Sequence, residues 1–306
     1  MIKSKIFIAG QEGMVGSSVY NLLKKKNLNI IECKRSSLDF LNQNSVDSWF
    51  KKNEVEIVVN CAGRVGGILE NSLKKDLFLN DNILIGINLI NASLKYNVKQ
   101  FINLGSACIY PKVTPLPIKE DYLLSSQLES TNEGYAIAKI ATLKYCEYLF
   151  KYKKKNFISL QPTNLYGFND NYNLKSSHVI PALVRKFHEA LIYKKKTVEV
   201  WGNKNTSRDF LFSEDLADLI FFLLKKKIKY PFINVGNAKE VTILELVELI
   251  KKIVGFNGNF YFNKNMPSGQ KRRVLSTSRL KSIGWFPRFS LEEGLKKYYD
   301  WFKKKY

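Results

Sequence analysis

The sequence predicts an α/β fold, in which a doubly wound parallel sheet is accompanied by a second, smaller lobe. Short apolar runs alternate with longer amphipathic segments through the first half of the chain. The first of these runs is followed at once by a glycine-rich turn. From about residue 165 the alternation gives way to an Asn-rich stretch at 168–177 and to less regular segments. Alternating strands and helices favour right-handed crossovers and a sheet covered on both faces, which is the arrangement of Rossmann folds.

Each element of the expected sheet domain has its own signature. The strands are short runs rich in Val, Ile, Leu and Phe, as in buried parallel strands. They are Ile6–Ala9, Leu28–Cys33, Val55–Cys61, Gln100–Leu104 and Phe157–Gln161. The expected helices run from the glycine turn through Lys26, over about 43–52, over about 76–96, and from the segment with Tyr135 and Lys139 to about Tyr152. The segment from Lys112 to Asn132, which contains Pro, Ser and Glu, is expected to form an irregular loop.

The second lobe is expected to interleave with the first. Residues 1–165 and parts of 205–240 are assigned to the nucleotide-binding domain, and about 166–204 and 241–306 to the smaller substrate-binding lobe. The latter includes an expected strand at Val198–Trp201. No internal repeat and no low-complexity linker separates the two parts. A chain of 306 residues has room for two unequal domains.

Composition narrows the class of protein. The hydrophobic content of 45% is enough for a substantial core, and no apolar run reaches the roughly 18 residues of a membrane span. The first strand begins at the N-terminus without the apolar stretch of a signal peptide. The cysteines at 33, 61, 108 and 146 lack the spacing of a zinc site, and a disulfide framework is not expected in a chain this long. We therefore expect a cytoplasmic protein without a metal centre.

The net charge of +22 admits three interpretations. A solvated Lys-rich surface is the simplest, because the lysine runs lie mostly near the ends of expected helices. A positive field would also steer anionic nucleotides toward a cleft. Nucleic-acid binding is disfavoured, since the runs are dispersed along the chain and lack the interleaved aromatic residues of a stacking platform. We expect neither nucleic acid nor a membrane as a partner. The runs lie at 24–26, 153–155, 194–196, 225–227 and 303–305.

Gly10, Gly13 and Gly16 mark a dinucleotide-binding turn. They are spaced Gly-x-x-Gly-x-x-Gly between the first strand and the first helix, which is the context that the motif requires. Gly10 permits the tight turn, Gly13 lets the backbone approach a pyrophosphate, and Gly16 allows close packing of helix and strand. The helix N-terminus then supplies amide donors and a partial positive charge. The expected cofactor-binding set also includes Met14, Val15 and, after the third strand, Ala62.

The end of the second strand bears on the choice between NAD and NADP. A carboxylate there would accept a hydrogen bond from the ribose 2′-hydroxyl and would repel a 2′-phosphate. This chain instead has Cys33-Lys34-Arg35-Ser36, with Asp39 a few residues later. Arg35, with Lys34 beside it, can pair with a 2′-phosphate. The sequence therefore favours NADP(H) over NADH, and the alternative is that these bases merely face water.

Tyr135 and Lys139 lie four residues apart in Gly-Tyr-Ala-Ile-Ala-Lys and so share one helical face. A neighbouring ammonium would lower the pKa of the phenol from its reference value near 10. Such a phenol can pass a proton to or from a carbonyl or alcohol oxygen. The pair alone is a weak signal in a chain with 16 Tyr, but the glycine turn and an upstream Ser-x-Cys segment strengthen it. Together they indicate a reductase.

These motifs stand in a chain that resembles the GDP-L-fucose synthase family of extended short-chain dehydrogenases/reductases. The resemblance spans nearly the whole chain, and its most specific parts are Cys-Ile-Tyr-Pro and the segment around His178. The matching segments include Ile-Ala-Gly-Gln-Glu-Gly-Met-Val-Gly-Ser, Arg64-Val-Gly-Gly-Ile-Leu, Leu-Gly-Ser106-Ala-Cys108-Ile-Tyr-Pro, Thr-Asn-Glu-Gly-Tyr135-Ala-Ile-Ala-Lys139, Gln-Pro-Thr-Asn164-Leu-Tyr-Gly, Ser-His178-Val-Ile-Pro-Ala-Leu-Val-Arg, Val-Trp201-Gly and Ser-Arg208-Asp-Phe-Leu.

Position by position, the resemblance implies a reductase trio and an epimerase pair. Ser106 would hydrogen-bond the C4 carbonyl of the substrate, Tyr135 would protonate it, and Lys139 would bind the nicotinamide ribose. Cys108 and His178 would form the epimerase pair, one removing a proton beside the ketone at C3 or C5 and the other delivering a proton to the opposite face. The chemistry is sensible, because a thiol and an imidazole both titrate near neutrality. The hydroxyls that assist reduction would also stabilise the enolate.

The resemblance further implies a homodimeric, NADPH-dependent epimerase/reductase that converts a GDP-4-keto-6-deoxy-sugar to a GDP-deoxysugar for surface polysaccharide. Lys186, Trp201 and Arg208 would line the GDP end of the site, with Asn164 near the sugar. Two alternatives stay open. One is a C4 reductase without epimerase activity, which acts on a GDP-4-keto-heptose or hexose. The other is a cofactor-binding module without turnover, which would be expected to lack the Tyr or the Lys, and both are present.

Four positions depart from the family pattern. Glu12 stands where an Arg near the cofactor phosphates is typical, so the preference for NADP(H) depends more on Arg35. Lys186 replaces a common Arg and lacks its bidentate fork. Gly134 and Phe212 stand where Pro and His are common. These changes would suit a different sugar, such as a 4-keto-heptose with its additional carbon.

Overall fold

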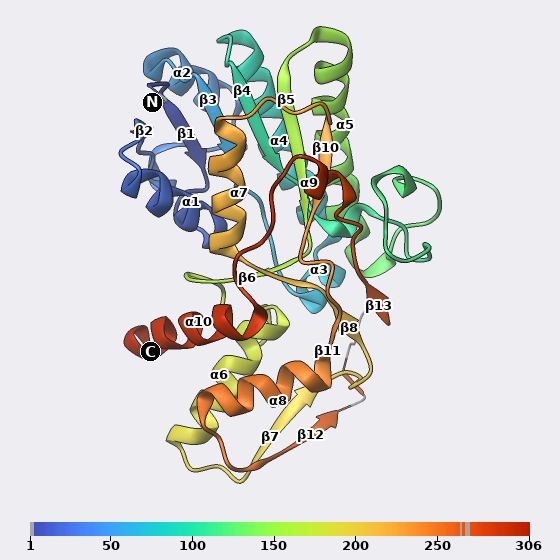
Figure 1. Cartoon of the computed structure of the whole chain (residues 1–306). Helices are drawn as coiled ribbons and strands as arrows, with labels where there is room; N and C mark the ends of the chain where they lie inside the picture. The colour runs from blue at the N-terminus through green and yellow to red at the C-terminus, as the bar shows by residue number, and fades with distance from the viewer. Residues whose placement is uncertain (1–2, 264, 267–269) are drawn as a thin grey trace.

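The computed structural model describes residues 3–263, 265–266 and 270–306 (Figure 1). Its centre is a six-stranded parallel sheet in the order β10-β5-β4-β3-β1-β2. The strands are β1 (Ile6–Ala9), β2 (Ile30–Ile31), β3 (Ile57–Asn60), β4 (Gln100–Leu104), β5 (Asn156–Pro162) and β10 (Phe232–Val235). The strand order reverses beside β1, because β2 lies on one side of it and β3 on the other. Ligands of doubly wound sheets bind at such a reversal, outside the carboxyl ends of the strands.

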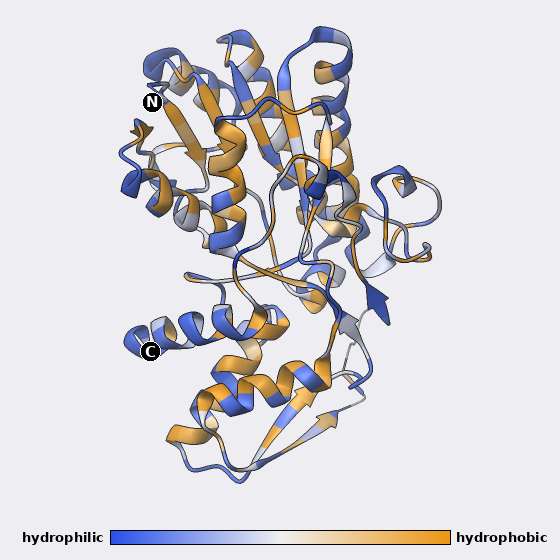
Figure 2. Ribbon diagram, in the orientation of Figure 1, coloured by the Kyte–Doolittle hydropathy of each residue, from blue (hydrophilic) through white to orange (hydrophobic). Residues whose placement is uncertain are grey.

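Helices cover both faces of this sheet. α1 (Met14–Lys25) and α7 (Ser213–Leu224) pack together on one face, and α2 (Gln43–Asn53), α4 (Lys75–Lys95) and α5 (Glu133–Lys153) lie on the other. Successive residues of β1 divide between the two cores: Ile6 and Ile8 join the first, and Phe7 and Ala9 join the second. Figure 2 shows apolar strands enclosed between helices whose polar residues face outward.

The second lobe, below the sheet in Figure 1, has its own core. It contains α6 (Val179–Ile192), α8 (Ile243–Val254) and α10 (Leu291–Lys305), with the parallel strand pair β7 (Thr197–Trp201) and β12 (Asn259–Asn263). Large aromatic side chains fill much of this core, and Phe187, Tyr298 and Phe302 are fully buried in it. Capping boxes at Thr242 and Ser290 start α8 and α10.

Short strands lie where the chain passes between the lobes. β6 (Asn164–Tyr166) pairs in parallel with β9 (Phe210–Phe212), and β8 (Ser207–Arg208) pairs with β11 (Val241–Thr242) and β13 (Arg272–Arg273). β9 leads directly into α7, so the chain returns from the second lobe to the sheet. The remaining α-helices of the described residues are the short α3 (Ile68–Leu73) and α9 (Ser278–Ser282).

The α/β fold with a parallel sheet is confirmed, and β1 and β4 begin and end at the predicted residues. The second strand is shorter than predicted, because only Ile30–Ile31 pairs with β1 before a 3-10 turn at Arg35–Ser37. The segment from Lys112 to Asn132 is less irregular than predicted, since 3-10 turns occur at Glu120–Tyr122 and Ser130–Asn132. α3 has no counterpart in the prediction.

Two departures from the family pattern have a packing reason. A Cβ on Gly134 would lie 2.4 Å from the Lys75 carbonyl oxygen, so glycine allows α5 to start in direct contact with the start of α4. The Phe212 ring is buried and packs against the rings of Tyr166, Phe168 and Phe289. Both residues therefore support the walls of the region between the lobes.

Candidate active site

One large cleft lies between the carboxyl edge of the sheet and the second lobe, with a volume of about 1240 Å³. The strand ends, the loop after β3 and parts of α6, β7 and β8 line it. Every site residue expected from the sequence also lines it, so the fold brings the whole set together. These residues are Gly10, Gly13, Met14, Val15, Gly16, Arg35, Ala62, Ser106, Cys108, Tyr135, Lys139, Asn164, His178, Lys186, Trp201 and Arg208.

The glycine turn has the geometry of an anion-binding turn. Gly10 has a left-handed φ of 77°, and a Cβ there would lie 2.9 Å from the backbone of Ala62. A Cβ on Gly16 would lie 2.0 Å from the Gly10 carbonyl oxygen, so α1 packs tightly on the turn. The Gly13 amide donates to that same oxygen (3.1 Å), and no side chain caps α1. The first amides of α1 are therefore left for a phosphate, and the residues fit a dinucleotide.

Arg35 lies beside an acidic residue. Residues 34–36 line the cleft after the second strand, together with Glu12 from the glycine turn. The Glu12 carboxylate accepts a hydrogen bond from the Arg35 amide (3.3 Å), and the Gln11 side chain accepts one from the Cys33 amide (3.3 Å). The basic segment is thus held against the turn that fits a pyrophosphate. Glu12 joins two loops here, which is a role that its charge alone does not suggest.

Ser106, Tyr135 and Lys139 converge at the end of β4. Ser106 directly follows this strand in extended conformation, and its amide donates to the Gln161 side chain (2.9 Å). Tyr135 lies in the first turn of α5. The Lys139 ammonium, one turn later, lies 5.6 Å from the centre of the Tyr135 ring and donates to the Leu104 carbonyl oxygen (2.9 Å). The phenol and the ammonium therefore share one corner of the cleft.

Burial controls the protonation of this corner. It raises the pKa of the Tyr135 phenol above its ordinary value, the nearby Cys108 adds to this effect, and the Ser106 hydroxyl opposes it. Burial lowers the pKa of Lys139 to about 8. The expected lowering of the tyrosine pKa by the lysine is therefore wrong, because desolvation of the buried phenol dominates. Tyr135 is held as a neutral phenol, which is a proton donor.

Cys108 and His178 come from different lobes. Cys108 lies in the 3-10 turn Ala107–Ile109 after β4, and its amide donates to the Ser106 hydroxyl (3.2 Å). His178 immediately precedes α6 and makes no capping hydrogen bond to that helix. Its side chain is open to the cleft, but the surrounding walls desolvate it and lower the pKa of the imidazole. The imidazole is therefore neutral near pH 7 and can accept a proton.

Lys186 and Trp201 form a wall on the second lobe. The Lys186 ammonium lies 4.7 Å from the centre of the Trp201 ring and donates to the Glu199 carbonyl oxygen (2.9 Å). The indole N–H donates to the Glu199 carboxylate (2.9 Å), which also accepts from Asn263 (2.7 Å). Burial lowers the pKa of Lys186, and Glu199 opposes this effect. Glu199 thus fixes both side chains, and sequence reasoning missed it.

Arg208 and Asn164 line the middle of the cleft wall, on β8 and β6. Burial and the nearby Arg273 lower the pKa of Arg208 to about 10, so it stays charged at neutral pH. Asn164 is exposed in the cleft and donates to the Asp209 carbonyl oxygen (2.9 Å). The cleft therefore offers a cation to an anionic group and an amide to a polar one.

Comparison with known proteins agrees with this geometry. The model of the NAD dependent epimerase/dehydratase family matches residues 6–236. The chain belongs to this family. Among its relatives is a GDP-L-fucose synthase of Sinorhizobium fredii, which is 43% identical over 97% of this chain and 95% of the relative. The resemblance inferred from the motifs is therefore confirmed.

Solved structures of other proteins are also similar to this member of the epimerase/dehydratase family. A GDP-6-OMe-4-keto-L-xylo-heptose reductase from C. jejuni is 32% identical with a TM-score of 0.92, covering 100% of this chain and 99% of that one. A GDP-mannoheptose C4 reductase from Campylobacter jejuni with NADP bound is 34% identical with a TM-score of 0.88, covering 99% of each chain. The doubly wound fold with its second lobe is confirmed by these structures.

Arg273 is a further residue of the cleft that sequence reasoning missed in this family member. It lies on β13, is buried, and donates to the Ala107 carbonyl oxygen (2.9 Å). It therefore ties the turn that carries Cys108 to a strand from the far end of the chain. Its one signal in the sequence was its place in a Lys-Arg-Arg run, which is typical of a solvated surface.

Proposed function

We propose that this protein is an NADPH-dependent epimerase and reductase, which converts a GDP-4-keto-6-deoxy-sugar to a GDP-deoxysugar. The observation that carries the proposal is the composition of the cleft, which joins a dinucleotide turn and a protonated tyrosine to a thiol and an imidazole. A dehydrogenase needs only the first two. The Cys–His pair adds proton exchange at carbon. The relationship to a GDP-L-fucose synthase indicates the class of nucleotide sugar.

Reduction uses the corner at the end of β4. NADPH, when bound, supplies the hydride that adds to C4. Ser106 donates a hydrogen bond to the C4 carbonyl oxygen, and Tyr135 gives that oxygen its proton, which completes the alcohol. Because burial raises its pKa, the phenol is protonated and ready to donate. Lys139 binds the ribose next to the nicotinamide, and its ammonium stabilises the phenolate that remains after the proton has left.

Epimerisation precedes reduction and uses the same ketone. One member of the Cys108–His178 pair removes the proton at C3 or C5, and the electron pair moves onto the carbonyl oxygen to form an enolate. The other member returns a proton to the opposite face of that carbon. Ser106 and Tyr135 donate to the oxygen and so stabilise the enolate. The pair suits proton transfer at two faces because its members are supplied by the two different lobes that line the cleft.

NADP(H) and the GDP-sugar bind to different parts of the rest of the cleft. Residues 1–165, with parts of 205–240, bind NADP(H) through the glycine turn, Ala62 and Lys139, and Arg35 pairs with the 2′-phosphate. Residues of about 166–204 and 241–306 bind the GDP-sugar. Trp201 offers a ring face to the base, Lys186 and Arg208 offer charge to the diphosphate, and Asn164 contacts the sugar. The separate hydrophobic core of the second lobe supports this division for most of its length, although Leu280, Ile283 and Trp285 pack in the core of the sheet domain.

We also infer a cytoplasmic homodimer that supplies surface polysaccharide synthesis. By length and composition α4 could span a membrane, but half of its apolar window is buried inside the protein, where it packs on α5. Other apolar side chains on these two helices stay exposed, such as Leu77 (40%), Ile137 (42%) and Tyr148 (51%). A second copy of the same surface would cover them. The four cysteines are free, as expected in a reducing compartment.

A C4 reductase without epimerase activity is the second candidate. Two structural neighbours with TM-scores of 0.92 and 0.88 are named as reductases of GDP-linked heptoses. Such an enzyme needs the Ser–Tyr–Lys trio and accepts a sugar whose C3 and C5 centres are already correct. The same cleft would serve, with Cys108 and His178 lining the sugar pocket.

Solvent exchange separates the two functions. The protein is incubated in D₂O with GDP-4-keto-6-deoxymannose or with a GDP-4-keto-heptose, first without and then with NADPH, and the sugar is analysed by mass spectrometry and NMR. We expect deuterium at C3 and C5 before reduction, followed by NADPH oxidation. Reduction without deuterium at these carbons would support the reductase alone. No NADPH oxidation with either sugar would contradict both candidates.

A further inference from the structure

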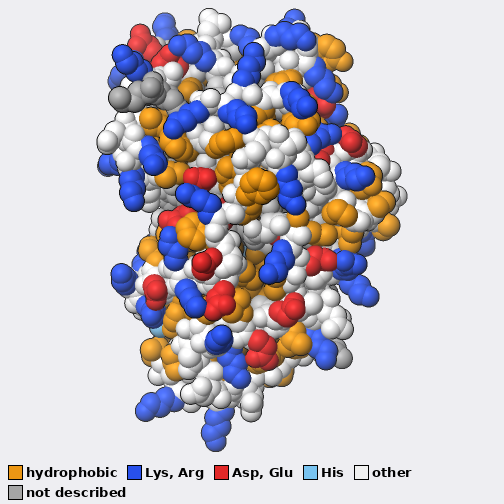
Figure 3. Space-filling view, in the orientation of Figure 1, with side chains coloured by type: hydrophobic (Ala, Val, Ile, Leu, Met, Phe, Trp, Pro, Cys, Tyr) orange, Lys and Arg blue, Asp and Glu red, His pale blue; other side chains and the backbone are white. Residues whose placement is uncertain are grey.

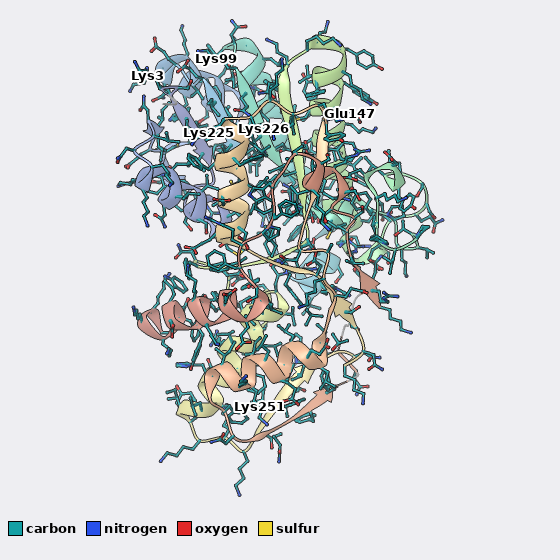
Figure 4. The ribbon with its side chains drawn as sticks, viewed as in Figure 1. Lys3, Lys99, Glu147, Lys225, Lys226 and Lys251 are labelled. Atoms are coloured by element: carbon teal, nitrogen blue, oxygen red, sulfur yellow. The ribbon has the colours of Figure 1, made fainter. Side chains whose placement is uncertain are left out.

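The lysines of the sheet domain gather at one end of the molecule, although their runs lie far apart in the sequence. In a doubly wound sheet each helix returns the chain to the amino edge of the strands, so the carboxyl ends of the helices meet there. In this protein those ends carry the lysines at 24–26, 51–52, 153–155 and 225–227. Figure 4 labels Lys3, Lys99 and Lys225 at this end; they lie before β1, between α4 and β4, and after α7. We call these lysines the basic end.

The basic end carries more positive charge than nearby carboxylates neutralise. Some of its lysines are paired, for example Lys99 with Glu56 and Lys151 with Glu147. Within the described part of the chain, the exposed lysines at 25–26, 153–154 and 225–227 take part in no ion pair. Figure 3 shows lysine and arginine side chains along this upper end. The runs are dispersed along the sequence as expected, but those of the sheet domain gather at one end, whereas those at 194–196 and 303–305 lie in the second lobe.

This end faces away from the cleft. The cleft lies at the carboxyl edge of the sheet, and the lysines lie at the amino edge (Figure 1). Charge at the amino edge does not focus nucleotides into the active site, so steering does not account for it. An anionic partner attracted there would contact the side of the protein opposite the chemistry.

We propose that the basic end docks on an anionic membrane surface, which replaces the expectation from the sequence that no membrane is a partner. Its cations are lysines. An ammonium is a point charge, which suits the diffuse negative potential of lipid head groups better than it suits bidentate binding of a single phosphate or carboxylate. Tyr152, toward the end of α5, is 76% exposed, and tyrosine is favoured at the lipid–water boundary. Docked in this way, the protein keeps its cleft open to dissolved nucleotide sugars.

The two phenylalanine rings beside Lys225 and Lys226 favour lipid over nucleic acid. Single-stranded nucleic acid needs free ring faces for stacking. The Lys225 ammonium instead lies 4.0 Å from the centre of the Phe221 ring, and that of Lys226 lies 5.0 Å from the centre of the Phe222 ring. These faces are covered by the ammonium groups of the protein itself. The basic end therefore attracts an anionic surface through its overall positive charge and not through ring stacking.

Vesicle flotation tests the proposal. The probe is phosphatidylcholine vesicles that contain or lack phosphatidylserine, at low salt and at about 0.5 M salt, where screening removes surface attraction. We expect binding only with phosphatidylserine and only at low salt. The triple variant Lys25→Glu, Lys225→Glu, Lys227→Glu should lose about tenfold or more in partitioning. The matched control Lys194→Glu, Lys195→Glu, Lys196→Glu makes the same change in net charge at the tip of the second lobe and should lose less than about twofold.

Three results would overturn the proposal. They are absence of binding to phosphatidylserine vesicles by the unchanged protein, an equal loss in the control variant, and tighter binding of random duplex DNA than of vesicles at the same salt. Thermal unfolding and NADPH binding show whether each variant is folded. The corresponding Lys→Gln variant, which removes charge without reversing it, should show a smaller loss at the same three positions. Vesicle binding is read independently of turnover, so its failure leaves the proposed enzymatic function untouched.

Discussion

The reductase group and the epimerase pair share one cleft but are built differently. Ser106, Tyr135 and Lys139 all belong to the sheet domain, at the end of β4 and in the first turns of α5. Cys108 shares that scaffold, whereas His178 is positioned by the start of α6 in the second lobe. Reduction therefore depends on the packing of the sheet domain alone. Epimerisation depends on how the sheet domain and the second lobe are positioned relative to each other. The difference teaches that the two activities can be lost separately.

The contact that brings His178 to the sheet domain is narrow. The Gly67 amide, in the loop after β3, donates to the Ser176 carbonyl oxygen (2.8 Å), two residues before the histidine. A Cβ on Gly67 would lie 2.9 Å from the Ser177 carbonyl oxygen, so the two backbones touch. By comparison, α5 packs along much of its length on α4 and β5. The epimerase pair is thus the more easily displaced of the two groups.

The largest effect is expected at Tyr135. Tyr135→Phe removes the acid that protonates the C4 oxygen and keeps the ring, so reduction should fall about 10³-fold. NADPH binding should persist, because the glycine turn is unchanged. Deuterium exchange at C3 and C5 should fall less, since Ser106 still donates to the enolate oxygen. NADPH absorbance, nucleotide fluorescence and mass spectrometry measure the three quantities. Reduction at the unmodified rate would contradict the assigned role.

Removing the epimerase pair should reverse that pattern. Cys108→Ser and His178→Gln should each lower deuterium exchange at one or both carbons about 10²-fold, because one of the two proton carriers is lost. Reduction of a substrate that already has the product configuration at C3 and C5 should stay within a few-fold of normal. Parallel assays of exchange and of NADPH oxidation check this. Equal losses in both assays would show that the two groups do not act separately.

The buried ammonium of Lys139 in the reductase group also lowers the free energy of unfolding. Burial lowers the pKa of Lys139 to about 8 from 10.5. Between these values the unfolded chain holds a proton that the folded protein has released, so stability rises with pH there and the full cost applies below about pH 8. After allowance for the lost hydrogen bond to Leu104, Lys139→Met should raise the free energy of unfolding by about 2 kcal/mol at pH 7.

The pH dependence of this gain distinguishes charge burial from better packing. The gain from Lys139→Met should shrink as the pH rises from about 8. Well above pH 10.5, where the lysine is neutral in both folded and unfolded chains, only the loss of the hydrogen bond to Leu104 should remain. Thermal unfolding of both proteins without cofactor, at pH 7 and at pH 10, measures it. A gain that is independent of pH, or a loss at pH 7, would contradict the burial of a charged lysine.

Features with a local cause could be predicted from the sequence. β1, β4 and the glycine turn follow from short apolar runs and glycine spacing, and the carboxyl ends of parallel strands meet at one edge. Tertiary effects could not be predicted. Arg273 meets the Ala107 carbonyl across a separation of 166 residues. The direction of the Tyr135 pKa shift depends on burial, which a Tyr-x-x-x-Lys spacing does not express. The lysine runs gather only through the topology of the sheet.

Arg273 offers the finest test of the comparison, because it ties the Cys108 turn to β13, which lies where the chain passes between the lobes. Arg273→Met leaves the Ala107 carbonyl oxygen without its donor, so Cys108 should shift relative to His178. We expect deuterium exchange to fall about tenfold, since a small misplacement weakens proton transfer. The kcat for reduction of a pre-epimerised substrate should change less than about twofold, because Tyr135 is held elsewhere.

Arg272 is the matched control for this variant. It is the neighbouring residue on β13, is exposed, and pairs with Glu240 (3.0 Å) instead of reaching the Cys108 turn. Arg272→Met should therefore leave exchange and reduction unchanged. A rise in the KM of both reactions with Arg273→Met, at unchanged kcat, would show that the guanidinium binds substrate and does not position Cys108. Partial recovery of exchange in Arg273→Lys, which restores a donor, would instead tie epimerisation to the contact between the lobes.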